Sequence, residues 1–220
     1  MAVADFDRAV EPRARPRSRL RSGLAALGVF GLAALALGVL MLSKGLLTVR
    51  EFWFMVHLSF GILIVHAFAG GLGTLLSTKD TPLRELVRVT TTITMALIAW
   101  LTVVSGTWMV YPGYRAKPVQ GQPLEGYPKE DLLAQGELGF WHNFGMEWKE
   151  HIGWLTPFLA TAVAFCVLRY GRQVMREPRI RRALTSLFVI AFAAAVVAAI
   201  LGAAINAVAP NEFLNDSRIV

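Results

Sequence analysis

Four histidines are the residues of this chain whose type and placement point most directly to chemistry. His57 and His66 lie inside an apolar stretch with no other ionisable side chain, and His142 and His151 lie in and just after the only long polar segment. An ionisable side chain at membrane depth is costly and therefore marks a candidate functional site. Because imidazole is the commonest ligand of metals and a frequent ligand of haem iron, the histidines predict a metal or a haem near one face of a membrane.

Long apolar runs are the elements that must position these histidines. Of the 220 residues, 55% are hydrophobic and 17% are charged, which is typical of a polytopic membrane protein. A run of about 20 apolar residues crosses about 30 Å of hydrocarbon as a helix, and the fourth run reaches this length if its helix begins before Ile152. The sequence predicts an all-α bundle of five transmembrane helices over Leu24–Leu42, Phe52–Leu76, Val89–Tyr111, Ile152–Leu168 and Ala183–Ala209.

Basic residues predict how this bundle is oriented. Most of the 22 Lys and Arg residues lie in segments 1–22, 77–88 and 169–182, and short cytoplasmic segments collect such residues. We therefore expect a cytoplasmic N-terminus, an outer C-terminus and a location in the inner (plasma) membrane of a bacterium. The expected organisation is a basic N-terminal segment (1–22), helices one to three (23–111), an outer segment (112–150), helices four and five (151–209) and an outer tail (210–220).

Several function classes are disfavoured by the composition. Cys166 is the single cysteine and lies inside the fourth run, so any haem would be bound noncovalently. The net charge of +7 includes an Arg-rich start beside a membrane run, where such residues set topology and bind anionic headgroups, so we expect no nucleic-acid partner. No apolar run contains a carboxylate or a basic residue, which argues against a small transporter or channel.

The outer segment 112–150 begins as a loop rich in Pro and Gly. From Asp131 to Glu150 proline is absent, and apolar residues recur at roughly helical spacing, namely Leu132, Leu133, Leu138, Trp141, Phe144 and Trp148. We expect an amphipathic helix that rests on the outer leaflet, or an extension of helix four. Such a surface would also dock other subunits of a membrane complex.

Depth along the helices predicts which histidines meet. His57 and His66 are nine residues apart, so they point to opposite sides of one helix and lie about 13.5 Å apart along it. His57 and His151 lie at nearly the same depth on helices that run in the same direction. The sequence therefore favours His57 and His151 as the pair that shares a cofactor.

Two imidazoles from two transmembrane helices suit the axial positions of a b-type haem. With His57 and His151 as candidate ligands in a small helical bundle, the chain resembles the membrane cytochrome b subunits that anchor redox enzymes and exchange electrons with quinone. Members with two stacked haems need histidines on one helix face, so the nine-residue spacing favours at most one haem here. Propionates of an outer haem would emerge at the level of Arg50, Arg115 and Lys149, with Tyr111 and Tyr114.

Two assignments remain open at the level of single residues. Glu147 and His151 are four residues apart on a helix and share a face, so they could present a carboxylate and an imidazole to a non-haem metal ion. His57 and His142 are further candidate metal ligands, although His142 faces away from that pair unless Gly145 breaks the helix. His66, the deepest histidine, could hydrogen-bond a neighbouring helix, join a proton path or line a quinone pocket.

Two function hypotheses follow from these residues. The first is an integral membrane subunit of an electron-transfer complex, with one haem b near the outer face and an anchoring or electron-relay role. The second is a cofactor-free structural or assembly subunit of a larger membrane complex, in which the histidines are structural. In both cases the lipid bilayer is a partner, and other subunits bind through segment 112–150.

Overall fold

The computed structural model of the chain describes residues 31–33, 36–79, 81–121, 123–124 and 127–209. The chain divides into two compact units, Met1–Lys44 and Gly45–Val220. In the first unit, residues 31–33 and 36–43 are helical, while the remainder of the predicted first span lies outside the described residues. The basic segment 1–22 and the tail 210–220 also lie outside them.

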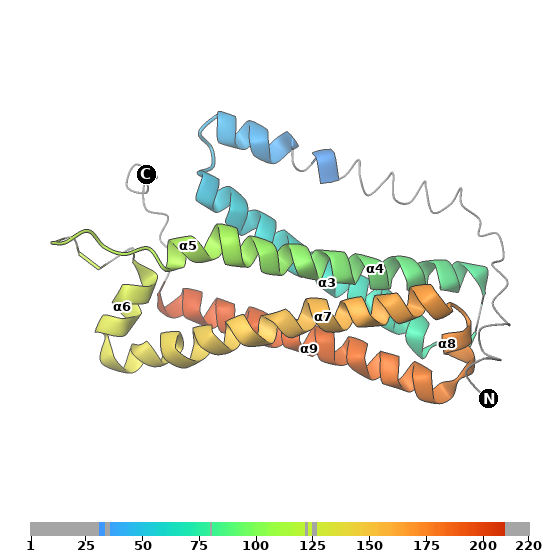
Figure 1. Cartoon of the computed structure of the whole chain (residues 1–220). Helices are drawn as coiled ribbons and strands as arrows, with labels where there is room; N and C mark the ends of the chain where they lie inside the picture. Colours follow the sequence, from blue (N-terminus) through green and yellow to red (C-terminus); the bar gives the residue numbers. More distant parts are fainter. Residues whose placement is uncertain (1–30, 34–35, 80, 122, 125–126, 210–220) are drawn as a thin grey trace. The chain divides into compact units, whose positions relative to one another are not determined.

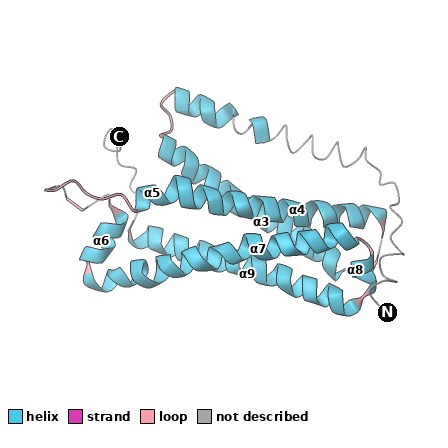
Figure 2. Ribbon diagram, viewed as in Figure 1, coloured by secondary structure: helices cyan, strands magenta, loops and turns pink. Residues whose placement is uncertain are grey.

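The second unit is built from helices only, over the part of it that the structure describes (Figure 2). Its long helices are α3 (Val49–Leu76), α4 (Pro82–Ser105), α7 (Glu147–Tyr170) and α9 (Pro178–Val208). Shorter elements join or extend them, namely the π-helix η1 (Gly106–Val110), α5 (Tyr111–Tyr114), α6 (Pro128–Ala134), the 3-10 helix η2 (Gly136–Leu138), the π-helix η3 (Trp141–Met146) and α8 (Gln173–Arg176).

Four helical stretches are long and apolar enough to cross a membrane, namely Val49–Leu76, Pro82–Tyr114, Gly136–Tyr170 and Pro178–Val208. By their length and composition the chain is an integral membrane protein, which confirms the predicted all-helical membrane class. The predicted count of five spans is not confirmed. Each helix extends beyond the charge-free run that predicted it, because backbone hydrogen bonds continue into the polar flanks.

The four long helices pack in a closed ring. α3 packs on α4, α4 on α7, α7 on α9, and α9 back on α3. Figure 1 shows that α3 and α7 run in one direction and α4 and α9 in the other. The bundle therefore has alternating direction, with α5 and α6 at one end, the α5 end, and α8 at the other, the α8 end (Figure 1).

Side-chain caps define where two of the helices begin. Thr48 accepts a hydrogen bond from the backbone N–H of Glu51 (3.2 Å), and the Glu51 carboxylate accepts one from the Thr48 backbone (2.7 Å). This reciprocal arrangement satisfies two backbone donors that the first turn of α3 would otherwise leave unpaired. Thr81 caps α4 with a single bond, accepting from the backbone N–H of Arg84. Pro82 fits the first turn because a backbone N–H at that position would have no partner within the helix.

The core of the bundle combines small residues with a few large apolar side chains. Phe188, Met95 and Leu75 are fully buried. Phe68 of α3 stacks on Phe192 of α9 at 3.9 Å between ring centroids. Gly71 lets the two helices approach, because a Cβ atom there would lie 2.6 Å from the Phe188 ring. Close packing of small residues is the main source of helix association within a bilayer.

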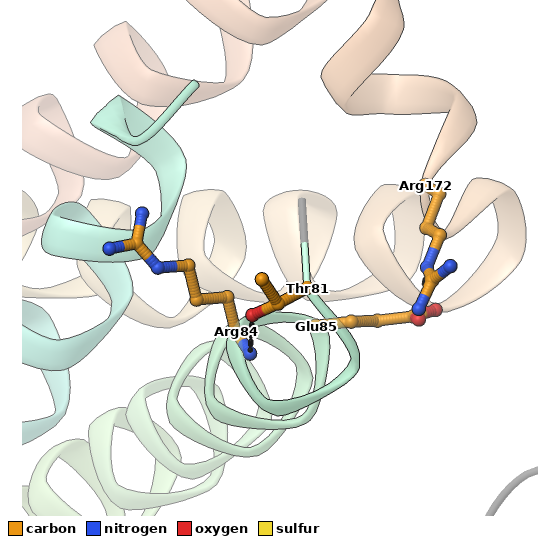
Figure 3. Close-up of polar contacts among 4 residues, drawn as sticks. All are labelled: Thr81, Arg84, Glu85 and Arg172. Atoms are coloured by element: carbon orange, nitrogen blue, oxygen red, sulfur yellow. Dashed lines mark hydrogen bonds and ion pairs between the residues drawn. The ribbon is translucent and has the colours of Figure 1, made fainter. Parts of the chain in front are cut away.

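Polar contacts fasten the α8 end of the bundle. The guanidinium of Arg172 lies 2.7 Å from the carboxylate of Glu85 and so joins the turn after α7 to the start of α4 (Figure 3). Arg84 donates to the hydroxyl of Ser77 at the end of α3. Arg88, one turn further along α4, is fully buried. These contacts tie three helices together where the chain leaves the apolar layer.

The outer surface of the bundle is apolar. Large hydrophobic side chains such as Leu63, Leu101 and Phe165 are exposed along the helices. In water such a surface would be unstable, but in a bilayer these side chains contact lipid tails. The surface therefore agrees with a lipid environment.

Over the described residues of the outer segment 112–150, the separate helix is the short α6, and the predicted amphipathic helix on the membrane surface is not confirmed. The loop that was expected to start at Pro112 instead starts after Tyr114, because η1 and α5 continue α4. Residues 136–170 form one continuous helical stretch, so the alternative expectation, an extension of helix four, describes the structure. The apolar stripe divides accordingly: Leu132 is buried against the bundle, whereas Phe144 and Trp148 are exposed.

Candidate functional site

His57 is the histidine that the structure places inside the bundle. It projects from α3 toward α4, where its Nδ1 lies 3.1 Å from the hydroxyl of Ser105. That hydroxyl also lies 3.1 Å from the backbone carbonyl of Thr102, to which it can donate its own proton. When the single proton of Ser105 points to that carbonyl, Nδ1–H of His57 donates to the hydroxyl oxygen and Nε2 keeps a free lone pair; when it points to Nδ1, Nε2 carries the hydrogen of the neutral ring.

A local change of helix geometry makes room for this imidazole. α4 becomes the π-helix η1 directly after Ser105, at Gly106. A Cβ atom at Gly106 would lie 2.8 Å from Cε1 of His57, so only glycine lets the ring lie this close to the backbone. Single π-turns inside helices are frequent at functional sites.

Lys149 enters the same region from α7. Its side chain crosses Gly202 of α9, where a Cβ atom would lie 3.0 Å from Cε of the lysine. It is half-buried and interacts electrostatically with His57 and Glu150. All four helices of the ring therefore contribute to one polar region near the α5 end of the bundle.

A second layer of polar side chains surrounds this region at the α5 end. The Tyr111 hydroxyl interacts with the carboxylate of Glu150. The guanidinium of Arg115 lies 5.2 Å from the centre of the Tyr111 ring. Arg50 lies flat against Gly113, where a Cβ atom would be 2.7 Å from its guanidinium carbon. Arg50 and Arg115, predicted from sequence to lie at one level, are thus both found at this end.

His142 belongs to the same end but lies outside the bundle interior. Its Nδ1 lies 3.0 Å from the hydroxyl of Tyr114. The Tyr114 side chain is buried and packs with residues of α6 and α9. The ring of His142 packs at 5.9 Å from that of Tyr114. This contact holds η3 against α5.

His151 lies on the outward face of α7. Its Nδ1 is 2.7 Å from the carbonyl of Glu147, one turn earlier, so Nε2 is available in this residue too. It lines an open surface groove of about 600 Å³ with Glu147 and the aromatic side chains of Phe144 and Trp148. Since residues two apart point to opposite sides of a helix, Lys149 and His151 cannot both face the interior. No contact among the described residues joins His57 to His151, so their pairing stays a prediction.

His66 is exposed on the outer face of α3. Its Nδ1 lies 3.0 Å from the carbonyl of Ile62 on its own helix. The other candidate roles, a proton path and a quinone pocket, stay predictions.

A metal centre made of several protein ligands is not found in the part of the chain that the structure describes. No group of three or more His, Cys, Asp or Glu side chains comes close enough there to hold an ion. The pair Glu147 and His151 shares the groove on α7, as expected from its spacing, but supplies two ligands only. A haem requires fewer protein ligands, because the porphyrin provides four nitrogen atoms.

The region around His57 has donor chemistry that fits a haem. Nδ1 of His57 contacts the Ser105 hydroxyl, which sets the orientation of the ring, and a hydrogen bond at one ring nitrogen is usual for metal-ligating histidines. Lys149 brings a positive charge to the same region, and Arg50 and Arg115 bring two more to the end of the bundle. Haem propionates are anionic, so basic side chains on one side of an imidazole suit them.

Sequence reasoning found His57 but missed the residues that hold it. Ser105 is polar and Gly106 is small, and together they interrupt an apolar run at about the depth of His57. This interruption is visible in the sequence and indicates where the histidine could pack. Gly202 lies in a helix rich in small side chains, where a single glycine does not stand out in the sequence. Its role depends on a contact with Lys149 that spacing along the chain does not reveal.

Comparison with models of protein families, with curated proteins and with solved structures gives no significant match for this chain. The functional conclusion therefore rests on the contacts described above.

Proposed function

We propose that this chain is an integral membrane subunit of an electron-transfer complex and binds one b-type haem near the α5 end of its bundle. His57 is the axial ligand that the geometry supports best. The observation that carries this proposal is an imidazole that turns toward α4 with its Nδ1 3.1 Å from the Ser105 hydroxyl, which leaves Nε2 to ligate iron in the tautomer that carries its proton on Nδ1.

The haem would supply reversible one-electron chemistry, and the chain would control its surroundings. Ser105 orients His57 and strengthens it as a ligand through the Nδ1 hydrogen bond. The apolar walls of α3, α4, α7 and α9 exclude water, which favours the less charged redox state of a bound iron. His151 faces away from the interior, so it would hold the iron only if α7 rotated, and that rotation would turn Lys149 outward.

The place of this subunit in a larger assembly follows from its proportions. The four spans take up more than half of the 220 residues, and an anchoring and electron-relay role suits such a chain better than substrate chemistry. The exposed rings of Phe140, Phe144 and Trp148 form a row, stacked between the two phenylalanines and tilted between Phe144 and Trp148, that is suited to docking other subunits. A quinone in the bilayer is the electron partner we propose, in a bacterial plasma membrane with the α5 end outside.

Absorption spectroscopy of the purified protein tests this proposal. We expect a Soret band and a reduced α band in the wild type, loss of both in His57→Ala, and their retention in His142→Ala. His151→Ala should convert a low-spin spectrum to a high-spin one if His151 is the second ligand. A wild-type protein that is folded, monodisperse and free of haem after expression with added haem precursor would instead support the structural or assembly role.

A further inference from the structure

Two arginines, Arg179 and Arg182, lie at the start of α9 with their side chains exposed. They are three residues apart, so they share one face of the helix. Like charges at this spacing repel each other, and no residue three or four positions from either arginine is a carboxylate. Among the described residues, no ion pair is found for either side chain. The described part of the chain therefore leaves this pair as a concentrated positive charge.

Other arginines at the α8 end of the bundle have contacts within the protein. Arg172 forms an ion pair with Glu85, with 2.7 Å between Nε and the carboxylate (Figure 3). Arg84 donates to the hydroxyl of Ser77, and Arg88 is fully buried. The two arginines of α9 differ from these because they face outward. This contrast indicates that their partner lies outside the chain.

The face of α9 that carries the two arginines continues as its lipid-facing surface. Val189 follows Arg182 by seven residues, or two turns, and is 40% exposed, while the next residue, Ile190, is 50% exposed. The opposite face is buried at Leu184 and Phe188. At 1.5 Å per residue, Arg182 lies about 10.5 Å beyond Val189 along the helix. Arginines at the end of an apolar helix face reach the level of the phospholipid headgroups.

The guanidinium of Arg182 is oriented by its own helix. Its Nε donates to the carbonyl of Pro178, one turn earlier (3.3 Å). No other hydrogen bond of this guanidinium is found within the described ranges, so its two Nη groups can donate to an acceptor outside the chain. The planar arrangement of these donors matches the oxygen atoms of a phosphate, which a guanidinium can bind through two parallel hydrogen bonds.

We propose that Arg179 and Arg182 bind the headgroup phosphate of an anionic phospholipid. The acyl chains of this lipid lie along Val189 and Ile190, on the same side of α9. Charge complementarity determines the class of lipid, because a zwitterionic headgroup carries a cation beside its phosphate, whereas phosphatidylglycerol does not. A phosphate between the two guanidinium groups offsets their mutual repulsion and holds the start of α9 at the membrane surface. The site does not depend on the proposed haem.

Native mass spectrometry of the full chain in detergent tests this assignment. The protein is titrated with phosphatidylglycerol and with phosphatidylcholine that has the same acyl chains, so the two ligands differ in the headgroup only. We expect the wild type to bind phosphatidylglycerol about thirtyfold more tightly, the combined effect of two basic residues on an anionic headgroup. Arg179→Gln combined with Arg182→Gln should lower this preference at least about tenfold.

Lys117→Gln combined with Lys129→Gln is the matched control, since it also removes two positive charges but near the α5 end, and it should preserve the wild-type preference. The wild-type comparison needs no variant, so it holds even if the double arginine variant fails to fold. Equal binding of the two lipids by the wild type, or an unchanged preference in a folded double arginine variant, would overturn the proposal. Displacement of phosphatidylglycerol by an equal concentration of glycerol 3-phosphate would also overturn it, because the site would then recognise a soluble phosphate ester. The haem proposal stands in each case.

Discussion

The contact with Ser105 orients His57 more directly than its depth in the membrane does. The Ser105 hydroxyl lies 3.1 Å from both the Thr102 carbonyl and Nδ1 of His57, so its one proton can go to either. The imidazole has a free Nε2 when that proton points to the Thr102 carbonyl. His66 and His151 use their own helix carbonyls for the same purpose but point away from the bundle interior.

Replacement of Gly106 tests whether the close approach of His57 matters. Gly106→Ala would place a methyl group 2.8 Å from Cε1 of the ring and so displace the imidazole. We expect haem affinity to fall about ten- to a hundredfold, as when the surroundings of a metal ligand are disturbed. The measurement is a Soret titration of the reconstituted protein.

Gly61→Ala is the control for that change, because nothing lies within 4 Å of a Cβ atom at Gly61. Both variants replace a glycine inside a transmembrane helix by a residue of higher helix propensity. If the two variants bind haem equally well, the contact between Gly106 and His57 is incidental.

The sequence could not predict which site residues point into the bundle and which point away from it. The histidines stood out because a polar residue in an apolar run is visible in the sequence alone. Which of Lys149 and His151 turns inward depends on the rotation of α7, and the helix offers no polar face to fix that rotation. The equal depth of His57 and His151 was therefore insufficient to establish a contact.

At the scale of elements, pairs of helices are held by close contacts at small residues. Gly71 of α3 allows the ring of Phe188 on α9 to lie where a side chain would otherwise stand. Gly73, on the same helix, has nothing within 4 Å of a Cβ atom. The two glycines therefore differ in packing although they are two residues apart and look alike in sequence.

This difference gives a stability prediction. Gly71→Ala should destabilise the protein by about 1–3 kcal/mol, because overpacking forces the Phe188 ring or the backbone to move. Gly73→Ala should be neutral or slightly stabilising. Unfolding by denaturing detergent, followed by circular dichroism, measures both. A larger loss at Gly73 than at Gly71 would contradict the packing of α3 on α9.

A side-chain hydrogen bond also joins two helices. The hydroxyl of Thr156 donates to the backbone carbonyl of Ala191 (3.0 Å), across the buried contact between α7 and α9. Thr156→Val should cost about 0.6 kcal/mol, and up to about 1.7, the range for such bonds in membrane helices. Thr185→Val is the control, since the hydroxyl of Thr185 bonds to its own helix at Arg181. Equal unfolding midpoints for the two variants would show that the interhelical bond adds nothing.

Helix existence was predictable here, whereas helix ends were not. Every charge-free run from residue 52 onward lies on a transmembrane helix. The ends depend on caps such as Thr48 and on π-turns such as η3, which continue a helix through residues that read as polar. The apolar stripe of the outer segment has helical spacing whether it lies on a membrane or extends α7, so periodicity alone could not separate these two structures.

At the scale of the whole molecule, the ring of four helices and the orientation that we propose give a labelling prediction. In a Cys166→Ala background, Lys117→Cys should react with an impermeant thiol reagent in intact cells, because the α5 end is proposed to face outward. Glu177→Cys should react only after the membrane is opened. Both residues are exposed, so access from one side of the membrane is what distinguishes them. Labelling of Glu177→Cys in intact cells would reverse the orientation.

The central claim is that one bundle holds one haem b through His57, and the haem content of the purified protein tests it most directly. Conversion of the bound haem to its pyridine complex gives the number of haem b groups per chain. We predict a ratio of about one for the wild type, since a single inward-facing histidine, His57, is found among the described residues. His57→Ala should bring the ratio close to zero. A folded wild-type protein with no haem, or a His57→Ala variant with the wild-type ratio, would contradict this claim.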